Sequence, residues 1–373
     1  MSRNTYDYIV VGAGLTGLSI ACGLSRNGHS VALLDTSDHP GGINRPVTFE
    51  RQLINNGLRH IPASDAAMKA LGFLENLLGL KIVNSASESL PKTFASGGIK
   101  TFVGFGENAP RFLREISQFA SGGYLRLNLE PYAWTGLLAD RFTGTFIPRS
   151  CVTRFHPQGD SVAFVTINGS KTLSGRNFIF TASVRDLISL LPEIALSARV
   201  RQRLANGTYW TALCLDLCHS SPVTDDDSLF ILDGASPDDL GPCVGKFLPS
   251  FNANGSQRQI SQWMTWLDEE SSEESELTAA AIKKIKRQIR RVWPDAIEGL
   301  VSERIVLCPN ISGSGDLKLT AGGQLPSLSN LWIASAALSP FPGLIGSLLQ
   351  AELILTQLTA SPPKHKESPE ISF

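Results

Sequence analysis

The start of the chain has the clearest pattern of apolar and polar positions. Tyr6 to Val11 is a largely β-branched and aromatic run, which is typical of a strand buried on both faces of a parallel sheet. From Leu15 to Leu24, apolar and small residues recur at helical spacing, and Gly28 lies where the helix would end. Ser30 to Leu34 predicts a second strand, which leads into Asp35. Together these elements predict a β-α-β unit.

The rest of the chain predicts a meander, an antiparallel sheet and a closing strand and helix. The runs Val152–Phe155 and Val162–Ile167, separated by polar turn residues, predict the meander. Between Thr208 and Leu267, strand-like runs alternate with turns rich in Asp, Ser, Pro and Gly, which predicts the antiparallel sheet. Leu331–Ala334 predicts a short strand, and a turn with two prolines separates it from a helix over Leu344–Leu358.

This order of elements predicts an α/β fold with two domains. One is a Rossmann-like domain with a parallel sheet, and the other is a smaller α+β substrate domain with an antiparallel sheet. The Rossmann-like domain is expected to be discontinuous and to take residues 1–60, 140–205 and 300–360, whereas the substrate domain takes residues 61–139 and 206–299. Residues 361–373, with three prolines and mixed charge, are expected to form a disordered tail.

Composition narrows the classes of partner. The chain has 373 residues, 42% of them hydrophobic, and a formal net charge of −1, so nucleic acid is not an expected partner. No secretory signal is visible, and Leu344–Leu358 is shorter than the roughly 20 apolar residues that cross a bilayer. We therefore expect a cytoplasmic protein without a transmembrane segment, and its oligomeric state stays open.

The six cysteines do not predict a metal site. They contain no CxxC pair, and the closest spacing is between Cys214 and Cys218. No histidine lies at metal-ligand spacing from them, so we expect reduced structural thiols.

The residues between the first strand and the first helix carry the candidate chemistry. They form a GxGxxG pattern and are Gly12, Ala13, Gly14, Leu15, Thr16 and Gly17. Gly12 and Gly14 would allow a tight turn without Cβ atoms that block a pyrophosphate, and Gly17 would let the helix pack closely on the strand. The helix N-terminus offers N–H groups to the phosphates. Asp35 can accept hydrogen bonds from the ribose hydroxyls of a dinucleotide.

The β-α-β unit alone does not decide between NAD and FAD, because both contain ADP. A longer pattern is more specific, and its residues are Gly12, Gly14, Gly17, Ala21, Leu24, Gly28, Val31 and Asp35, followed by Gly41 and Gly42. This pattern resembles the N-terminal signature of the superfamily of flavin-containing amine oxidases, protoporphyrinogen oxidases and phytoene desaturases. The resemblance implies that FAD is the cofactor and that Gly41 and Gly42 lie against it. It also implies that Arg45 approaches the phosphates, although Arg45 can be read as a solvated loop residue.

Two later segments resemble the same superfamily. The resemblance implies that Val152 pairs through its backbone with the adenine, although Val152 can equally be an ordinary strand residue. Leu331–Leu338 and Pro342–Leu348 are similar to the closing strand, turn and helix of the superfamily. This similarity implies that Gly343 and Leu344 begin a helix whose N-terminus points at the pyrimidine end of the isoalloxazine.

One departure weakens the expected flavin site. The superfamily has Gly-Asp after the closing strand, where the Asp binds a ribityl hydroxyl, and this chain has Ser335-Ala336. Losing a charge-assisted hydrogen bond costs roughly 1.5 to 3 kcal/mol, or about tenfold to a hundredfold in affinity, unless Ser335 substitutes.

The resemblance implies an FAD-dependent oxidoreductase that transfers a hydride from a small or apolar substrate to flavin N5. Members of the superfamily often place a lysine near N5, and Lys246 is the candidate catalytic residue, although it can also be an exposed lysine on a strand. Two other functions stay open. One is a non-redox flavoenzyme similar to the sugar mutases. The other is a catalytically silent FAD-fold protein that acts as a binding or assembly partner, which Ala336 favours.

Overall fold

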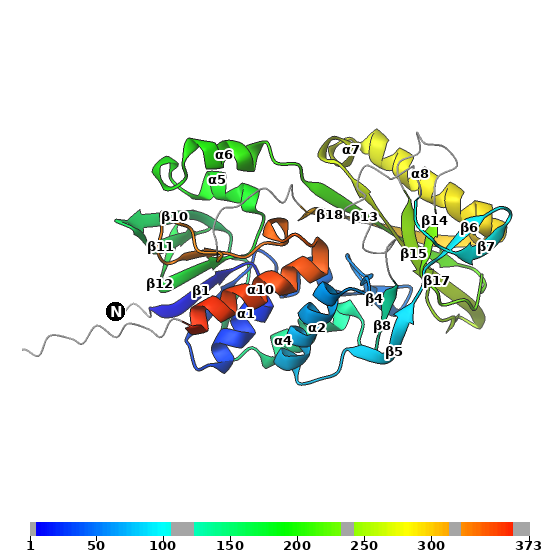
Figure 1. Ribbon diagram of the computed structural model, residues 1–373, viewed down its shortest axis with the longest axis horizontal. Helices are drawn as coiled ribbons and strands as arrows, with labels where there is room; N and C mark the ends of the chain where they lie inside the picture. Colours follow the sequence, from blue (N-terminus) through cyan, green and yellow to red (C-terminus); the bar gives the residue numbers. More distant parts are fainter. Residues whose placement is uncertain (1–4, 106–122, 233–241, 313–321, 361–373) are drawn as a thin grey trace, which may run out of the picture.

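The computed structural model describes residues 5–105, 123–232, 242–312 and 322–360 (Figure 1). One sheet, with β1 in it, lies toward one end of the long axis, and a second sheet, with β13 and β17, lies toward the other end (Figure 1). The predicted disordered tail at residues 361–373 lies outside the described residues.

The first sheet is built around the predicted β-α-β unit. Its central strand β1 (Tyr6–Val11) pairs in parallel with β2 (Val31–Leu34) on one side and with β12 (Lys171–Phe180) on the other. The other strands are β9 (Thr145–Ile147) beside β2, β19 (Leu331–Ile333) beside β12, and the antiparallel β10 (Val152–Gln158) and β11 (Ser161–Ile167). Ile9 and Val10 point to opposite faces of β1 and are both fully buried, as a parallel sheet covered on both sides requires.

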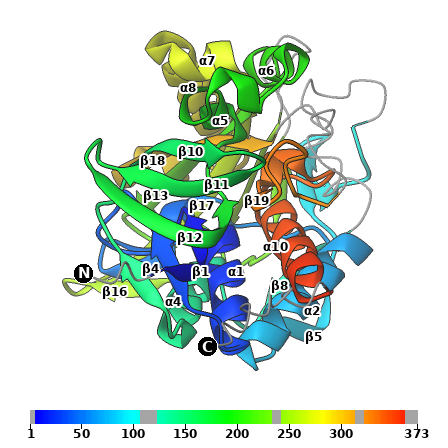
Figure 2. The ribbon, with the colours of Figure 1, turned by 90° about the vertical axis from the view of Figure 1, so that its left-hand side faces the viewer.

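Two helices from opposite ends of the chain cover one face of this sheet. Figure 2 shows α1 (Leu15–Arg26) and α10 (Gly343–Ala360) side by side. They touch closely at Gly23, where an added Cβ atom would lie 2.6 Å from Cδ1 of Leu355. The opposite face packs against apolar side chains of the meander, such as Phe155, and of α5 (Leu187–Leu190).

The start of α1 also lies very close to the end of β1. A Cβ atom added to Gly17 would lie 1.8 Å from the carbonyl oxygen of Gly12 and 2.9 Å from Oγ1 of Thr181. The Thr181 hydroxyl donates to the carbonyl of Gly12 at 3.1 Å, which holds the turn against β12. Only glycine fits at position 17 without moving the helix away from the strand.

The second sheet is antiparallel apart from its β14–β6 pair. Its strands, in spatial order, are β18 (Leu300–Ser312), β13 (Trp210–His219), β17 (Ser256–Leu267), β15 (Cys243–Phe247), β14 (Phe230–Leu232), β6 (Lys92–Ala95) and β7 (Gly98–Thr101), and β16 (Phe251–Ala253) pairs with the end of β17. Side chains alternate between the two faces of each strand. Leu213, Leu215 and Leu217 therefore pack toward α8 (Ser275–Val292), whereas Ala212 and Cys214 join the core that contains β1 and α10.

Shorter elements complete the chain. The remaining helices are α2 (Asp65–Leu78), α4 (Pro131–Arg141), α6 (Ala198–Ala205), α7 (Glu269–Glu273) and α9 (Pro294–Glu298). Two small antiparallel sheets pair β3 (Pro46–Phe49) with β4 (Gln52–Asn55) and β5 (Val83–Ser89) with β8 (Tyr124–Leu127).

The predicted fold class is confirmed, because the structure combines a largely parallel Rossmann-like sheet with a separate antiparallel sheet. The predicted first strand, first helix and closing helix are present, and the closing helix is somewhat longer than expected, at Gly343–Ala360. The domain boundaries stay a prediction. Within the segment 300–360, β18 pairs with β13 of the antiparallel sheet. Among the helices that the structure describes, none has the length and apolarity that a bilayer span requires.

We predict that Gly17→Ala destabilises the fold by about 3 kcal/mol, because the new methyl group overlaps the Gly12 carbonyl. Urea unfolding followed by circular dichroism measures this difference. The matched control is Gly72→Ala in α2, where an added Cβ atom meets nothing within 4 Å and the helix should gain up to about 1 kcal/mol. Equal unfolding midpoints for the two variants would contradict the close packing at Gly17.

Candidate functional site

The first candidate site is the turn between β1 and α1. Gly12 has a φ of +103°, in the region that favours glycine. Gly14 is the N-cap of α1, and an added Cβ atom there would meet nothing within 4 Å. The first N–H groups of a helix have no partner within the helix, so those of α1 are available to an anion beside Gly14. Ala13, Leu15 and Thr16 complete the turn, which has the form expected for binding a pyrophosphate.

Asp35 lies against this turn, as predicted. Its Oδ2 accepts a hydrogen bond from the Ala13 N–H at 2.6 Å, and its Oδ1 accepts one from the Ser37 N–H at 2.8 Å. A carboxylate can accept about four hydrogen bonds, so acceptor positions remain for the hydroxyls of a ribose. The side chain is thereby fixed beside the helix N-terminus.

The glycine pair after β2 also lies on the turn. The Gly41 N–H donates to the Ala13 carbonyl at 2.7 Å, and a Cβ atom on Gly42 would lie 3.1 Å from Cα of Gly14. Gly42 begins the short turn η1 (Gly42–Asn44), and Arg45 follows it with an exposed side chain. Gly12, Gly14 and Asp35 therefore lie close to the glycine pair Gly41 and Gly42 in the structure.

Val152 and Ser335 have defined structural positions. Val152 is the first residue of β10 and is buried in the same core as Leu34. Ser335 is buried, and its Oγ accepts a long hydrogen bond from the Ala337 N–H at 3.4 Å, which caps η4 (Ala336–Leu338). The structure does not test a contact of either residue with a cofactor.

The N-terminus of α10 borders a small cavity. Gly343 has a φ of +64° and begins the helix, and a Cβ atom added to it would lie 3.1 Å from Cδ1 of Leu58. The cavity has a volume of about 40 Å³ and is bordered by Leu344, Leu58, His60 and Trp266, among others. A water molecule needs at least about 10 to 15 Å³ in such a measure, so this cavity holds a few waters at most.

A row of polar side chains crosses the face of the second sheet that is turned toward β4. Arg304, Asp216, Gln262 and Lys246 lie in register on β18, β13, β17 and β15. Their neighbours on this face are mainly apolar, so the row is a polar line through a core. Sequence reasoning selected only Lys246 from this row. The sequence feature that could have indicated the rest of the row is Asp216, a carboxylate within the otherwise apolar run Leu213–Cys218.

Asp216 is the centre of a buried charge cluster. Its side chain and that of Arg59 are fully buried and form an ion pair. The second oxygen of Asp216 accepts from Nη1 of Arg304 at 2.9 Å, and Gln262 donates to the first at 2.9 Å. Burial lowers the pKa of Arg59, but the charge and hydrogen bond of Asp216, together with the neighbouring Cys214 and Cys308, outweigh burial and raise this pKa overall. Arg59 is therefore charged, and the cluster holds two cations for one anion.

The segment that follows β4 is bonded directly to this cluster. Arg59 donates from Nε to the Gly57 carbonyl at 2.8 Å, and Gln262 donates to the Asn55 carbonyl at 3.2 Å. Arg304 donates to the side-chain oxygen of Asn56. A Cβ atom added to Gly57 would lie 2.9 Å from Sγ of Cys308, so the segment touches β18 without an intervening layer.

Some buried polar atoms around this segment lack a hydrogen-bond partner. They are Oδ1 of Asn44, Nη2 of Arg59, Nε2 of His60 and Oε1 of Gln262. Leaving such an atom without a partner costs about 1 to 3 kcal/mol, and native structures contain few of them. Unpartnered atoms on neighbouring segments are typical of a place that a polar ligand occupies.

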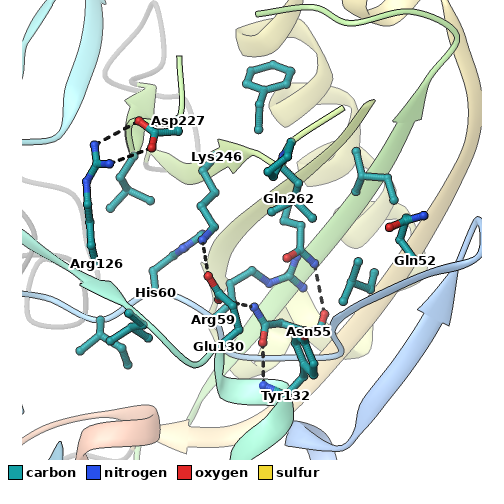
Figure 3. A pocket seen from close by; sticks show the side chains of 18 of the residues that line it. Gln52, Asn55, Arg59, His60, Arg126, Glu130, Tyr132, Asp227, Lys246 and Gln262 are labelled. Carbon is teal, nitrogen blue, oxygen red and sulfur yellow. Dashed lines mark hydrogen bonds and ion pairs between the residues drawn. The ribbon is translucent and has the colours of Figure 1, made fainter. Parts of the chain in front are cut away.

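A larger pocket lies on the other side of the same segment (Figure 3). Its volume is about 590 Å³, which is within the range of small-molecule sites. Lys246 donates to Glu130 at 2.9 Å, and Glu130 accepts from Asn55 at 3.1 Å. Asn55 in turn accepts from the Tyr132 N–H at 2.8 Å, which ties β4 to the start of α4. Lys246 therefore faces this pocket, and its side chain is only 21% exposed.

His60 lies between the two cavities and borders both. Burial lowers the pKa of its imidazole well below the ordinary value, and the positive charges of Lys246 and Arg59 lower it further. The imidazole is therefore neutral at pH 7, and taking up a second proton costs free energy.

These residues fit one half of a dinucleotide better than the other. The adenosine and pyrophosphate half fits the open space at Gly14 and the carboxylate of Asp35. The resemblance places the isoalloxazine near the N-terminus of α10. There, Asn44, Arg59 and His60 offer unpartnered polar atoms, but the cavity of about 40 Å³ is much smaller than the roughly 300 Å³ of a small ligand site.

The thiols and the metal prediction can also be compared with the structure. The six cysteines form no disulfide with one another, and five of them are buried. In the part of the chain that the structure describes, no group of three or more His, Cys, Asp or Glu side chains could hold a metal ion.

Comparison with known proteins agrees with this geometry. The model of the NAD(P)-binding Rossmann-like domain family matches residues 10–77. An oxidoreductase from Methanosarcina mazei has a similar structure, with a TM-score of 0.70 and 11% identity over 95% of this chain and 100% of that chain. No curated protein matches the sequence.

Two amine oxidases have similar structures. Putrescine oxidase, solved with putrescine bound, gives a TM-score of 0.68 and 13% identity over 96% of this chain and 100% of that chain. Cyclohexylamine oxidase from Brevibacterium oxydans gives a TM-score of 0.64 and 12% identity over 95% and 100%. The sequence resemblance is thus confirmed at the level of the fold, which is that of the amine-oxidase-like FAD oxidoreductases.

We predict that Asp216→Asn destabilises the protein by about 3 to 5 kcal/mol, because the fully buried Arg59 then lacks a compensating carboxylate. Chemical denaturation measures the change. Glu298→Gln is the control, since its ion pair with Arg290 is 59% and 62% exposed and contributes about 1 kcal/mol or less. A similar loss of free energy of unfolding in both variants would show that burial of the Asp216 cluster does not increase the effect of losing a carboxylate.

We predict a pH-dependent contribution from His60. Its folded-state pKa lies well below the ordinary 6.5, so the unfolded chain binds the extra proton first as pH falls below 6.5. Between pH 6.5 and 5.5 the wild type should therefore lose about 1 kcal/mol more of its free energy of unfolding than His60→Gln. Urea titrations at both pH values measure the difference. Parallel losses in the two proteins would contradict a buried neutral imidazole.

Proposed function

We propose that this chain is an FAD-dependent oxidoreductase that removes a hydride from a small organic substrate. The observation that carries the proposal is the arrangement at the β1–α1 turn. There Asp35 accepts a hydrogen bond from the Ala13 N–H, and the space beside Gly14 is open, since a Cβ atom added there would meet nothing within 4 Å. The fold, shared over nearly the whole chain with putrescine oxidase and cyclohexylamine oxidase, supports FAD over NAD.

The proposal assigns the cofactor contacts to named residues. The N-terminus of α1 with Gly12 and Gly14 would hold the pyrophosphate, and Asp35 would bind the adenosine ribose. Gly41 and Gly42 would lie against the dinucleotide, with Arg45 near its phosphates and Val152 beside the adenine. At the other end, Ser335, Gly343 and Leu344 would meet the flavin. When bound, FAD supplies a two-electron acceptor for the hydride.

The pocket residues would supply binding and orientation. Lys246 is held by Glu130, which keeps the lysine side chain at the pocket wall. His60 stays neutral at the wall shared by the two cavities, so it adds no positive charge beside Lys246 and Arg59. The buried side chains around them exclude water from this wall. We propose Lys246 as the residue that positions the reacting part of the substrate.

A second candidate function is a catalytically silent protein that keeps the nucleotide half of the site. The small size of the cavity at the N-terminus of α10, about 40 Å³, favours it, since a flavin ring needs more space. Ala336 acts in the same direction, because it offers no acceptor to a ribityl hydroxyl. Such a protein would bind ADP-containing molecules and would act through its surface.

We predict that Gly14→Ala weakens the binding of ADP and FAD at least about tenfold while the fold stays intact. The added methyl group meets no protein atom within 4 Å and would occupy the space assigned to the pyrophosphate. Calorimetric titration of purified protein with each nucleotide measures this, with Gly72→Ala as the control that should bind like wild type.

The same titrations separate the two candidates. Binding of FAD with a visible flavin spectrum that substrate bleaches supports the oxidoreductase. Binding of ADP without binding of FAD supports the silent protein. Unchanged affinities in Gly14→Ala, or no binding of either nucleotide by wild type, would overturn the assignment of the turn.

A further inference from the structure

The charges that line the pocket of about 590 Å³ do not balance. Three cationic side chains border it, namely Arg59, Arg126 and Lys246, and two carboxylates, namely Glu130 and Asp227. Arg304 and Asp216, which lie behind Arg59, cancel each other. His60 is neutral, so the wall carries an excess of one positive charge.

The pocket also has more unused cationic donors than unused anionic acceptors. Both oxygens of Glu130 already accept, one from Lys246 and the other from Asn55. Both oxygens of Asp227 accept from the guanidinium of Arg126, at 2.8 and 3.0 Å. Every carboxylate oxygen in the pocket lining therefore already accepts one hydrogen bond from a protein donor.

Lys246 has donors to spare. An ammonium group carries three N–H bonds, and one is used by Glu130. The lysine lies next to Gln262 on β17, at the end of the polar row, and both side chains project toward the pocket (Figure 3). Oε1 of Gln262 is an unpartnered acceptor, but it belongs to a neutral amide and does not change the charge balance.

Apolar residues make up the rest of the pocket wall. Leu53, Ile54, Leu125, Phe251 and Ile260 border it at various depths. Its volume is sufficient for an organic molecule with an apolar body. A ligand that matches both the apolar wall and the spare cationic donors carries one negative charge at one end.

We propose that this pocket binds a small carboxylic acid with an apolar body, and that its carboxylate is held by Lys246. This inference deepens the proposed function by naming the substrate class, and it rests on that function only for the reaction, since binding can be measured without flavin. An amine at the same place would meet a Glu130 that is already paired and would be repelled by Lys246 and Arg59.

The experiment compares three probes that share a phenylpropyl body and differ in the polar group at its end, which is anionic, neutral or cationic. Hydrocinnamate, hydrocinnamide and the corresponding phenylpropylamine are titrated calorimetrically into the full chain at pH 7. The acid should bind at least about tenfold more tightly than the amide and the amine. In Lys246→Met, this preference for the acid should disappear.

Two variants control the result. Lys92→Met removes a lysine that pairs with Asp226 at 2.6 Å outside the pocket lining, and it should keep the preference for the acid. Glu130→Gln keeps the size of the side chain but removes its charge, so the acid should bind as tightly as before or more tightly. This variant keeps the test decisive if Lys246→Met fails to fold, which circular dichroism would reveal.

Several outcomes would overturn the inference. They are a preference for the amine that Glu130→Gln abolishes, equal binding of the three probes, and no binding of any probe at millimolar concentration. Failure of the proposed function looks different, because a protein that binds hydrocinnamate but never retains FAD would keep this inference and lose the redox reaction.

Discussion

The position of the segment 55–60 on the second sheet depends on a single buried carboxylate, Asp216. A charge without solvent is tolerated only when it is paired and hydrogen-bonded, and Asp216 has Arg59, Arg304 and Gln262 as partners. These partners come from the segment after β4, from β18 and from β17. Apolar packing alone tolerates small shifts between layers, whereas a multiply bonded carboxylate permits one arrangement. Asp216 therefore fixes how the segment 55–60 lies on the second sheet.

Both cavities follow from this placement. On one side of the segment, Leu58 approaches Gly343 and Gly57 touches Cys308, which leaves the small cavity at α10. On the other side, Asn55 reaches Glu130 and so shapes the larger pocket. His60 and Ile61 border both cavities. The two cavities therefore share one wall.

The sequence predicted the parts of the structure that depend on local geometry. The β-α-β unit, Asp35 and the closing helix follow from periodicity, glycine positions and helix ends within short stretches of chain, and the structure has all of them. The polar row could not be predicted, because it depends on the register between strands that are far apart in the chain. Lys246 was selected from its strand, but its partner Glu130 lies 116 residues away. The sequence around Arg59 likewise does not indicate that its partner is Asp216.

This division between local and distant determinants also separates fold from activity. The nucleotide half of the site is made mostly of backbone, so it survives wherever a few glycines and one carboxylate are kept. The proposed flavin half would need side chains from several distant segments, so a single change such as Ala336 would alter it without disturbing the sheets. Structural similarity to solved oxidoreductases at 11% to 13% sequence identity therefore supports the architecture of this chain. The chemistry must be argued from the site itself. In this chain that site includes the wall with His60 and Ile61, because these two residues border both the cavity at α10 and the larger pocket.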